Sequence, residues 1–387
     1  IATANHAARK IFSLVGEGVF FQDLYHYGPP YFRSGGTIDC WGHKRWVYRQ
    51  VAQALAALKP AEQRIVTGRT TPTRVAIIAN LSDDLRRGNV PGFLNDRLLV
   101  YLALRHAQFP VDLLLERDLR EISTCDLDAY DAIYLTGMRL EREGFAALKR
   151  WCEAGGTLLA TGMAATRDEF GDPMPESNAF LGATRSVEGI SEKSWHPDRI
   201  PELKLLGRLE LAESRHTPEA EVPVVGVRYG IKPLGNGRVL GRFADGKPAI
   251  CTREVDEGRI ILYGFMPGMS YRFNTFRKGG EIGGYRDDLR AVFSRPVIAA
   301  CGRPQVETSS PLVETTVFQD EEGLAVLLND FTWEGEREMK LTVRTRAAIK
   351  KVWATIGKVL SWRNLEEGIE IHCRAPDPVD VILMEYR

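Results

Sequence analysis

The sequence lacks the patterns of a membrane protein, a disulfide scaffold or a nucleic-acid binder. It contains no run of 18 apolar residues, so no stretch is long enough to cross a membrane as a helix. Its six cysteines form no Cys-x-x-Cys pair, and in a chain of 387 residues we expect small buried thiols rather than a disulfide framework. The 51 basic residues balance 51 acidic ones, so the basic excess typical of nucleic-acid binding is missing. We therefore expect no membrane and no nucleic-acid partner.

Signals for a metal, a cofactor or a secretion route are equally sparse. Cys40-x-x-His43 has a spacing that could hold zinc, but no second pair accompanies it. We therefore expect no metal and no cofactor. The chain begins at Ile1 and shows no signal peptide, so we expect it to be processed or to be a piece of a longer protein, and the cytoplasm is the favoured location.

Residues 74–162 carry the pattern of a doubly wound α/β domain. Short apolar runs alternate with helical segments at about 96–108 and 143–154, which indicates buried parallel strands with helices on both faces. The runs read R-V-A-I-I-A-N from Arg74, V-D-L-L-L-E from Val111, D-A-I-Y-L-T-G from Asp131 and G-G-T-L-L-A-T-G from Gly155. Ligands of such sheets bind at the carboxyl ends of the strands.

The segments on either side of this domain follow other patterns. A helix over 3–15, a strand from Val19 to Tyr25 and a helix over about 44–58 read as the last βα unit of a larger barrel whose other strands are absent, or as an addition to the edge of the next sheet. The polar stretch 59–73 reads as a linker, and 165–205 as a long loop. Strands follow within 239–264, a helix over 287–300 closes the domain, and period-two alternation from about 304 predicts a small antiparallel β-sandwich.

In this order the segments resemble the carboxyl-terminal half of family 42 β-galactosidases. Three stretches carry the likeness: Val19-Phe20-Phe21-Gln22; Ala103–His106 with Pro110–Asp112, Asp131 and Gly155–Leu158; and Asp245–Ala249 with Gly258–Ile260. The resemblance implies the end of a (β/α)8 barrel over 1–66, a flavodoxin-like, class I glutamine amidotransferase-like trimerisation domain over 67–303, and a β-sandwich over 304–387. It further implies a homotrimer and a galactoside-like carbohydrate as the ligand of the full-length enzyme.

The residues that would perform catalysis are absent from this sequence. Glycoside hydrolysis needs two carboxylates flanking the bond. In the family that the chain resembles, the acid Glu follows an Asn on barrel strand four and the nucleophile ends strand seven, whereas no Asn here precedes a Glu. Amidotransferases of this general shape hold a cysteine in a Gly-x-Cys-x-Gly turn, and the comparable turn reads Ala160-Thr161-Gly162-Met163-Ala164. We predict no catalytic residue in the chain and no hydrolysis by it alone.

Candidate substrate contacts lie in one loop after the first strand. Loops at the carboxyl ends of barrel strands line active sites, and Tyr25, His26, Tyr31 and Trp41 all follow Val19–Leu24. Tyr31 and Trp41 could stack on a sugar or plug the barrel mouth, and His26 could contact substrate or make a local hydrogen bond. After Phe-Phe-Gln the family places a Trp, but Asp23 stands here, which points to a more distant branch.

A second hypothesis is a self-contained binding module without catalysis. In that case a small ligand or a protein partner would bind at the carboxyl ends of the α/β strands. Asp83 and Asp84 follow the first of these strands, where they could cap the next segment or contact a ligand.

Overall fold

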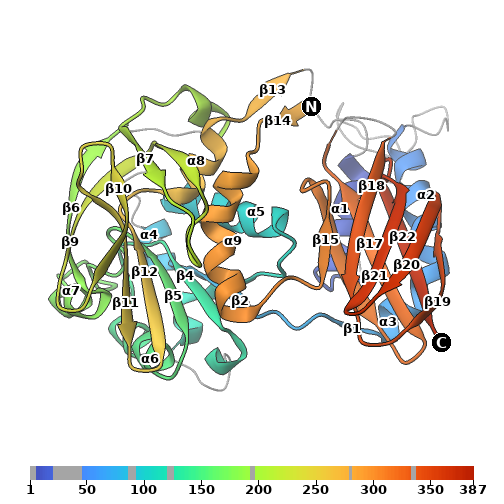
Figure 1. The fold of residues 1–387 in the computed structure, drawn as a ribbon, viewed down its shortest axis with the longest axis horizontal. Helices are drawn as coiled ribbons and strands as arrows, with labels where there is room; N and C mark the ends of the chain where they lie inside the picture. The colour runs from blue at the N-terminus through green and yellow to red at the C-terminus, as the bar shows by residue number, and fades with distance from the viewer. Residues whose placement is uncertain are drawn as a thin grey trace, which may run out of the picture. The chain divides into compact units, whose positions relative to one another are not determined.

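The computed structural model describes residues 6–20, 46–85, 93–119, 126–191, 197–278, 281–332 and 337–387. The chain forms two compact units (Figure 1). The α/β unit holds Thr73–Phe276 and Gly283–Arg303. The sandwich unit holds Ile1–Pro72, Arg277–Ile282 and Pro304–Arg387.

Among the described residues, the α/β unit is built on one mixed sheet in the order β3-β2-β4-β5-β12-β11-β10-β7-β8. The first five strands of this order run parallel, and the remaining neighbours pair antiparallel. The strands are β2 (Val75–Ala79), β3 (Asp112–Leu115), β4 (Ala132–Leu135), β5 (Thr157–Thr161), β7 (Gly207–Leu211), β8 (Ala220–Val224), β10 (Arg238–Phe243), β11 (Pro248–Val255) and β12 (Gly258–Tyr263). Every residue of β2, β4 and β5 is buried, as their continuous apolar runs predict.

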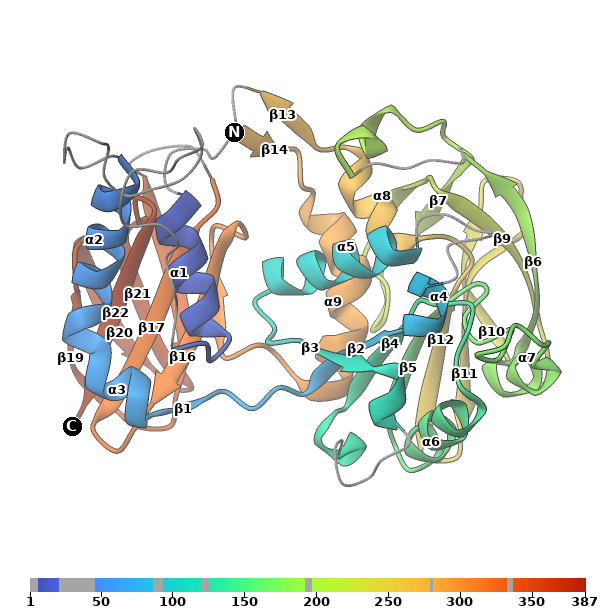
Figure 2. The same cartoon turned by 180° about the vertical axis from the view of Figure 1, so that it is seen from behind.

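Helices cover both faces of the parallel strands (Figures 1 and 2). On one face Leu104 and Phe293 pack with Ile77, and on the other Leu148 packs with Ile78, because successive strand residues point to opposite faces. The helices are α4 (Leu81–Leu85), α5 (Phe93–His106), α6 (Arg142–Glu153), α7 (Pro175–Leu181), α8 (Pro267–Phe273) and α9 (Asp287–Cys301). The expected α/β architecture with helices on both faces is therefore present.

The stretch 165–205 is more ordered than its composition predicts. It contains α7, strand β6 (Ala183–Ile190) and the short 3-10 helix η4 (Pro197–Glu202). β6 pairs antiparallel with β9 (Val227–Pro233) in a separate ribbon. The expected long loop is wrong here because Phe180 and Leu181 of α7 are buried in the core beside α6.

In the sandwich unit two antiparallel sheets enclose one apolar core. One sheet has the order β1-β16-β17-β22-β19 and the other β15-β18-β21-β20 within the described part of the chain. The strands are β1 (Arg69–Thr70), β15 (Val306–Thr308), β16 (Val313–Gln319), β17 (Gly323–Asp330), β18 (Glu338–Arg344), β19 (Ile349–Ala354), β20 (Val359–Leu365), β21 (Gly368–Arg374) and β22 (Val379–Tyr386). Val326 and Ile382 face Leu341 and Ile371 across this core, so the expected antiparallel β-sandwich is present.

Amino-terminal helices cover the outer face of the β16–β17–β22 sheet. They are α1 (His6–Gly16), α2 (Trp46–Leu58), the 3-10 turn η1 (Lys59–Ala61) and α3 (Glu62–Thr67). Phe12 of α1 and Ala54 of α2 join Leu327 and Leu383 in one buried cluster. Polar bonds add to this contact, since Asn329 Nδ2 donates to the Arg9 carbonyl at 3.0 Å and the Arg9 guanidinium donates to the Thr332 carbonyl at 2.9 Å.

In the first 73 residues the structure differs from the sequence-based expectations at three places. Residues 59–70 are not a linker, because Ile65 is buried in the helix–sheet cluster and Thr70 pairs with Phe318. Val19 and Phe20, where the predicted strand begins, are not in a strand, and residues 21–25 lie outside the described residues. The helical period of α2 predicts an inward face of Trp46, Val47, Val51, Ala54, Leu55 and Leu58, but its buried residues are Gln50, Ala54 and Ala57, and Val51 and Leu58 are only partly buried.

Candidate functional site

The four predicted substrate contacts cannot be placed. Tyr25, His26, Tyr31 and Trp41 lie outside the described residues, as do Cys40 and His43. Immediately before them, Val19 is 41% exposed and Phe20 56% exposed. The aromatic loop therefore stays a prediction.

The sheet itself provides a second candidate position, at the carboxyl ends of β2 and β4. From β2 the chain crosses to β3 on one side, and from β4 it crosses to β5 on the other, so the strand order reverses between β2 and β4. Open α/β sheets bind ligands at such a switch point. Asn80 and Asp83 follow β2, and Arg139 follows β4, so side chains from both strands meet here.

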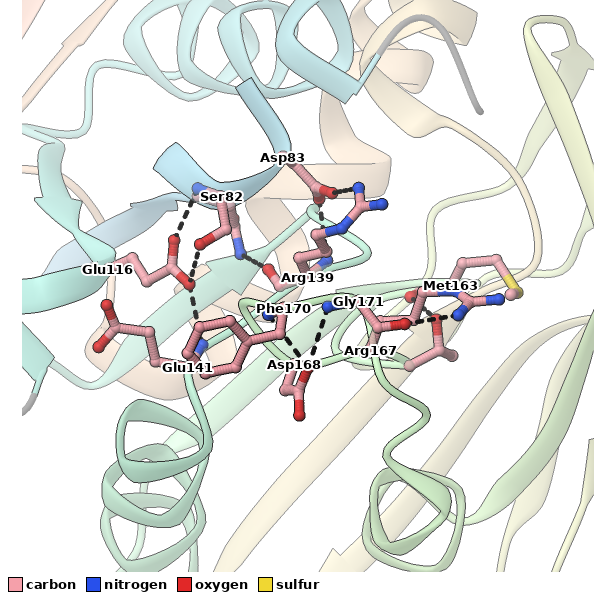
Figure 3. A network of polar contacts seen from close by, with 12 residues as sticks. Ser82, Asp83, Glu116, Arg139, Glu141, Met163, Arg167, Asp168, Phe170 and Gly171 are labelled. Atoms are coloured by element: carbon pink, nitrogen blue, oxygen red, sulfur yellow. Dashed lines mark hydrogen bonds and ion pairs between the residues drawn. The ribbon is translucent and has the colours of Figure 1, made fainter. Parts of the chain in front are cut away.

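Asp83 pairs with Arg139, and Asp84 pairs with Arg97. The Asp83 carboxylate accepts the Arg139 backbone N–H at 3.0 Å and a guanidinium N–H at 3.2 Å (Figure 3). Burial raises the pKa of Asp83, and the hydrogen bonds from Arg139 oppose that shift. Asp84 lies 2.5 Å from the guanidinium of Arg97. Both aspartates therefore have partners within the unit, which favours a structural role over ligand contact.

Glu116 is the centre of this network, and sequence reasoning missed it. Its side chain is almost fully buried after β3 and accepts the Ser82 N–H at 3.0 Å, the Ser82 hydroxyl at 3.0 Å and the Glu141 N–H at 2.8 Å (Figure 3). Ser82 lies in the first turn of α4 and Glu141 caps α6, so one carboxylate serves the amino ends of two helices, where negative charge is favourable. The only signal in the sequence was its position directly after an apolar strand.

The turn after β5 offers no nucleophile. Gly162 is followed by Met163, and a Cβ on Gly162 would lie 2.3 Å from the Tyr229 ring, so only glycine allows this contact. Beyond the turn, Asp168 accepts three backbone N–H groups, from Phe170, Gly171 and Asp172, which shape the following loop. Phe170 and Gly171 are labelled beside Asp168 in Figure 3. The side chains at this strand end build structure and carry no reactive thiol.

The described cysteines are protonated thiols. Burial raises the pKa of Cys152 and Cys373 to about 12, and that of Cys251 and Cys301 to about 11. A cysteine nucleophile needs the opposite shift, because the thiolate is the reactive form. These four cysteines are therefore unsuited to amidotransferase chemistry.

Two further features are absent from the described ranges. Within them, no group of three or more His, Cys, Asp or Glu side chains could hold a metal ion. No helix in the same ranges is long and apolar enough to cross a membrane.

Similarity to known proteins lies in the fold. No family model matches the chain, and no curated protein matches its sequence. Among solved structures, a catalytic mutant of a GH42 β-galactosidase from G. stearothermophilus superposes with a TM-score of 0.69 at 15% identity, over 100% of this chain and 51% of the other. The β-galactosidase from Bacillus circulans sp. alkalophilus gives 0.70 at 14% identity, over 99% and 52%. The α-L-fucosidase isoenzyme 2 from Paenibacillus thiaminolyticus gives 0.61 at 12% identity, over 99% and 57%.

These matches define the class of fold. The chain is a mixed α/β structure with a sheet containing parallel strands and with antiparallel sheets, and it spans about half the length of the solved structures that it matches. It has the fold of part of a GH42 β-galactosidase and fits a carboxyl-terminal portion of such a chain, which confirms the resemblance seen in the sequence.

Proposed function

We propose that the chain is the carboxyl-terminal, non-catalytic part of a β-galactosidase-like glycoside hydrolase that degrades carbohydrate. The observation that carries this proposal is the superposition of the whole chain, both units included, on about half of GH42 β-galactosidase chains. The α/β unit is then an amidotransferase-like oligomerisation domain. Residues 1–66 are the end of a barrel, and Tyr25, His26, Tyr31 and Trp41 contribute to one wall of the active site in the full-length enzyme.

The chemistry of the α/β unit agrees with this assignment. The parallel strands have the order β3-β2-β4-β5-β12, which is the flavodoxin-like order 2-1-3-4-5. The turn after β5 carries Met163 in place of a thiol, and the described cysteines have raised pKa values. A domain of this shape with no thiol in the turn after β5 is suited to assembly rather than to amidotransferase catalysis.

The alternative is a self-contained binding module. Its ligand would bind between β2 and β4, where Ser82 and Glu141 already donate hydrogen bonds to the Glu116 carboxylate. A ligand there would have to displace these bonds, which makes the alternative weaker. The upstream coding sequence separates the two, since an in-frame barrel with two glutamates at strand ends favours the hydrolase.

The oligomeric state tests the assembly role. We expect the purified chain to form a trimer of about 130 kDa, from three chains of 43.3 kDa, because the family that it resembles is trimeric through this domain. Light scattering coupled to gel filtration measures the mass. A monomer at micromolar concentration in both this chain and the full-length enzyme would remove oligomerisation from the proposal.

The aromatic loop tests the barrel-wall role in the full-length enzyme. Replacing His26 or Trp41 with alanine is expected to lower kcat/KM by about 10- to 100-fold, which is about 1.4 to 2.7 kcal/mol of transition-state binding. The control is Trp46→Ala, which removes an exposed tryptophan of α2 outside the loop. Melting temperatures identify loss of folding. Full kcat/KM in both loop variants would show that these side chains do not contact substrate.

A further inference from the structure

Asp96 connects two helices of the α/β unit from a fully buried position. It lies in the first turn of α5 and is 0% exposed. Its Oδ1 accepts the backbone N–H of Met269 at 3.1 Å, in the first turn of α8. The two helices approach closely at Gly268. A Cβ atom added there would lie 2.4 Å from the Asp96 carbonyl oxygen and 2.9 Å from the Val100 nitrogen, so only glycine fits. The carboxyl group is therefore part of the α5–α8 contact.

The other half of this carboxyl group lies in apolar surroundings. Asp96 Oδ2 is buried without a hydrogen-bond partner among the described residues, and so is the hydroxyl of Tyr229 on β9. Tyr229 belongs to a buried cluster with Leu99, Met266 and Met269, which come from α5 and from the start of α8. An ionised carboxylate here would be shielded from water, and its Oδ2 has no hydrogen-bond partner among the described residues.

The charged groups on neighbouring elements are occupied by other partners. Arg97 pairs with Asp84 of α4, and Arg139 pairs with Asp83. Arg272 of α8 donates to Thr275 and to Tyr285. Tyr229 is the titratable group that interacts with Asp96, and it brings no positive charge. Asp83 acts on Tyr229 as well, and it is also an acid.

The protonation state of this carboxyl group follows from its position. Burial raises the pKa of Asp96 to about 7, and hydrogen bonds from Met269 and Gly268 oppose the shift. Burial also raises the pKa of Tyr229, and the charges of Asp96 and Asp83 raise it further. A carboxyl group exposed to water titrates near pH 3.9. Opening the α5–α8 contact is therefore coupled to loss of a proton.

We propose that Asp96 is a proton-controlled latch that fastens the first turn of α8 to α5. In the closed state the protonated carboxyl group fits the apolar cluster. When the proton is lost, an uncompensated charge lies between the helices, and α8 separates from α5 until water reaches the carboxylate. The latch is a conformational device of the α/β unit and does not depend on the proposed hydrolase.

Hydrogen exchange of the α8 amides measures the latch in the full chain. Because the closed-state pKa is raised, opening becomes easier as pH rises from about 4 to about 7, and it levels off above 7 when the closed state is also ionised. We expect the protection of Met269–Arg272, corrected for intrinsic exchange, to fall by up to about 10-fold per pH unit in that window. Asp96→Asn removes the dependence, while Asp128→Asn, at an exposed acid of the same unit, keeps it.

A second variant keeps the test decisive if Asp96→Asn does not fold. Tyr229→Phe conserves the buried ring and removes the hydroxyl that can donate to the ionised carboxylate, so the levelling-off point moves to higher pH. Protection of α8 that is constant between about pH 4 and 8 in the wild type overturns the latch. So does a pH dependence that survives Asp96→Asn, or an unchanged profile in Tyr229→Phe.

Discussion

Replacing Phe12 with alanine is expected to lower the free energy of unfolding of the sandwich unit by about 3–5 kcal/mol. Phe12 is 2% exposed and packs in the cluster that joins α1 to the outer face of the β16–β17–β22 sheet. Truncation removes the transfer energy of the ring and leaves a cavity beside Leu327 and Leu383. Urea unfolding followed by circular dichroism measures the change.

Phe20→Ala is the matched control for this prediction. Phe20 is the same residue type in the same segment, but it is 56% exposed, so its loss is expected to cost less than about 1 kcal/mol in this chain. Equal effects of the two substitutions would show that α1 does not cover the sheet in solution. A large effect of Phe12→Ala alone supports the helical layer.

The packing of α1 on this sheet shows which features of the fold could be predicted from the sequence and which could not. The buried face of α1 could be predicted from its period, because Ala8, Ile11, Phe12 and Val15 recur at helical spacing. Its partner could not, because the sheet lies some 300 positions later in the chain. A signal was nevertheless present in β17, where Leu324–Leu328 is apolar at every position. A strand with one solvated face alternates, so a continuous run indicates cover on both sides.

In the candidate site, too, some residues could be predicted from the sequence and others could not. Asp83 could be found from sequence because it lies shortly after the buried strand β2. Its partner Arg139 could not, because the pairing depends on β2 and β4 being neighbours in the sheet. Local patterns predict strands and their ends, while strand order decides which ends meet. The loop of Tyr25, His26, Tyr31 and Trp41 remains a prediction from the resemblance alone.

The second large expected effect on stability is at Glu116, which the strand order brings close to Ser82 and Glu141. Glu116→Ala leaves the N–H groups of Ser82 and Glu141, which are partly buried, without their acceptor. An unsatisfied donor costs about 1–3 kcal/mol when it is fully buried, so two would cost about 2–6 kcal/mol. Because these two are partly buried, we expect the α/β unit to lose stability in the lower half of that range. Glu116→Gln keeps one acceptor oxygen and is expected to recover about half of that loss. The control is Glu143→Ala, which removes an exposed glutamate from the first turn of α6.

Urea unfolding measures these three variants, and the result also bears on function. If Glu116 stabilises the amino ends of α4 and α6, then the switch point is occupied by the chain's own side chains, as an assembly domain allows. A ligand-binding switch point behaves differently, because functional sites are strained and their polar groups can often be replaced with a gain in stability. A neutral or stabilising Glu116→Ala would therefore contradict the structural role of this carboxylate and would favour the self-contained binding module.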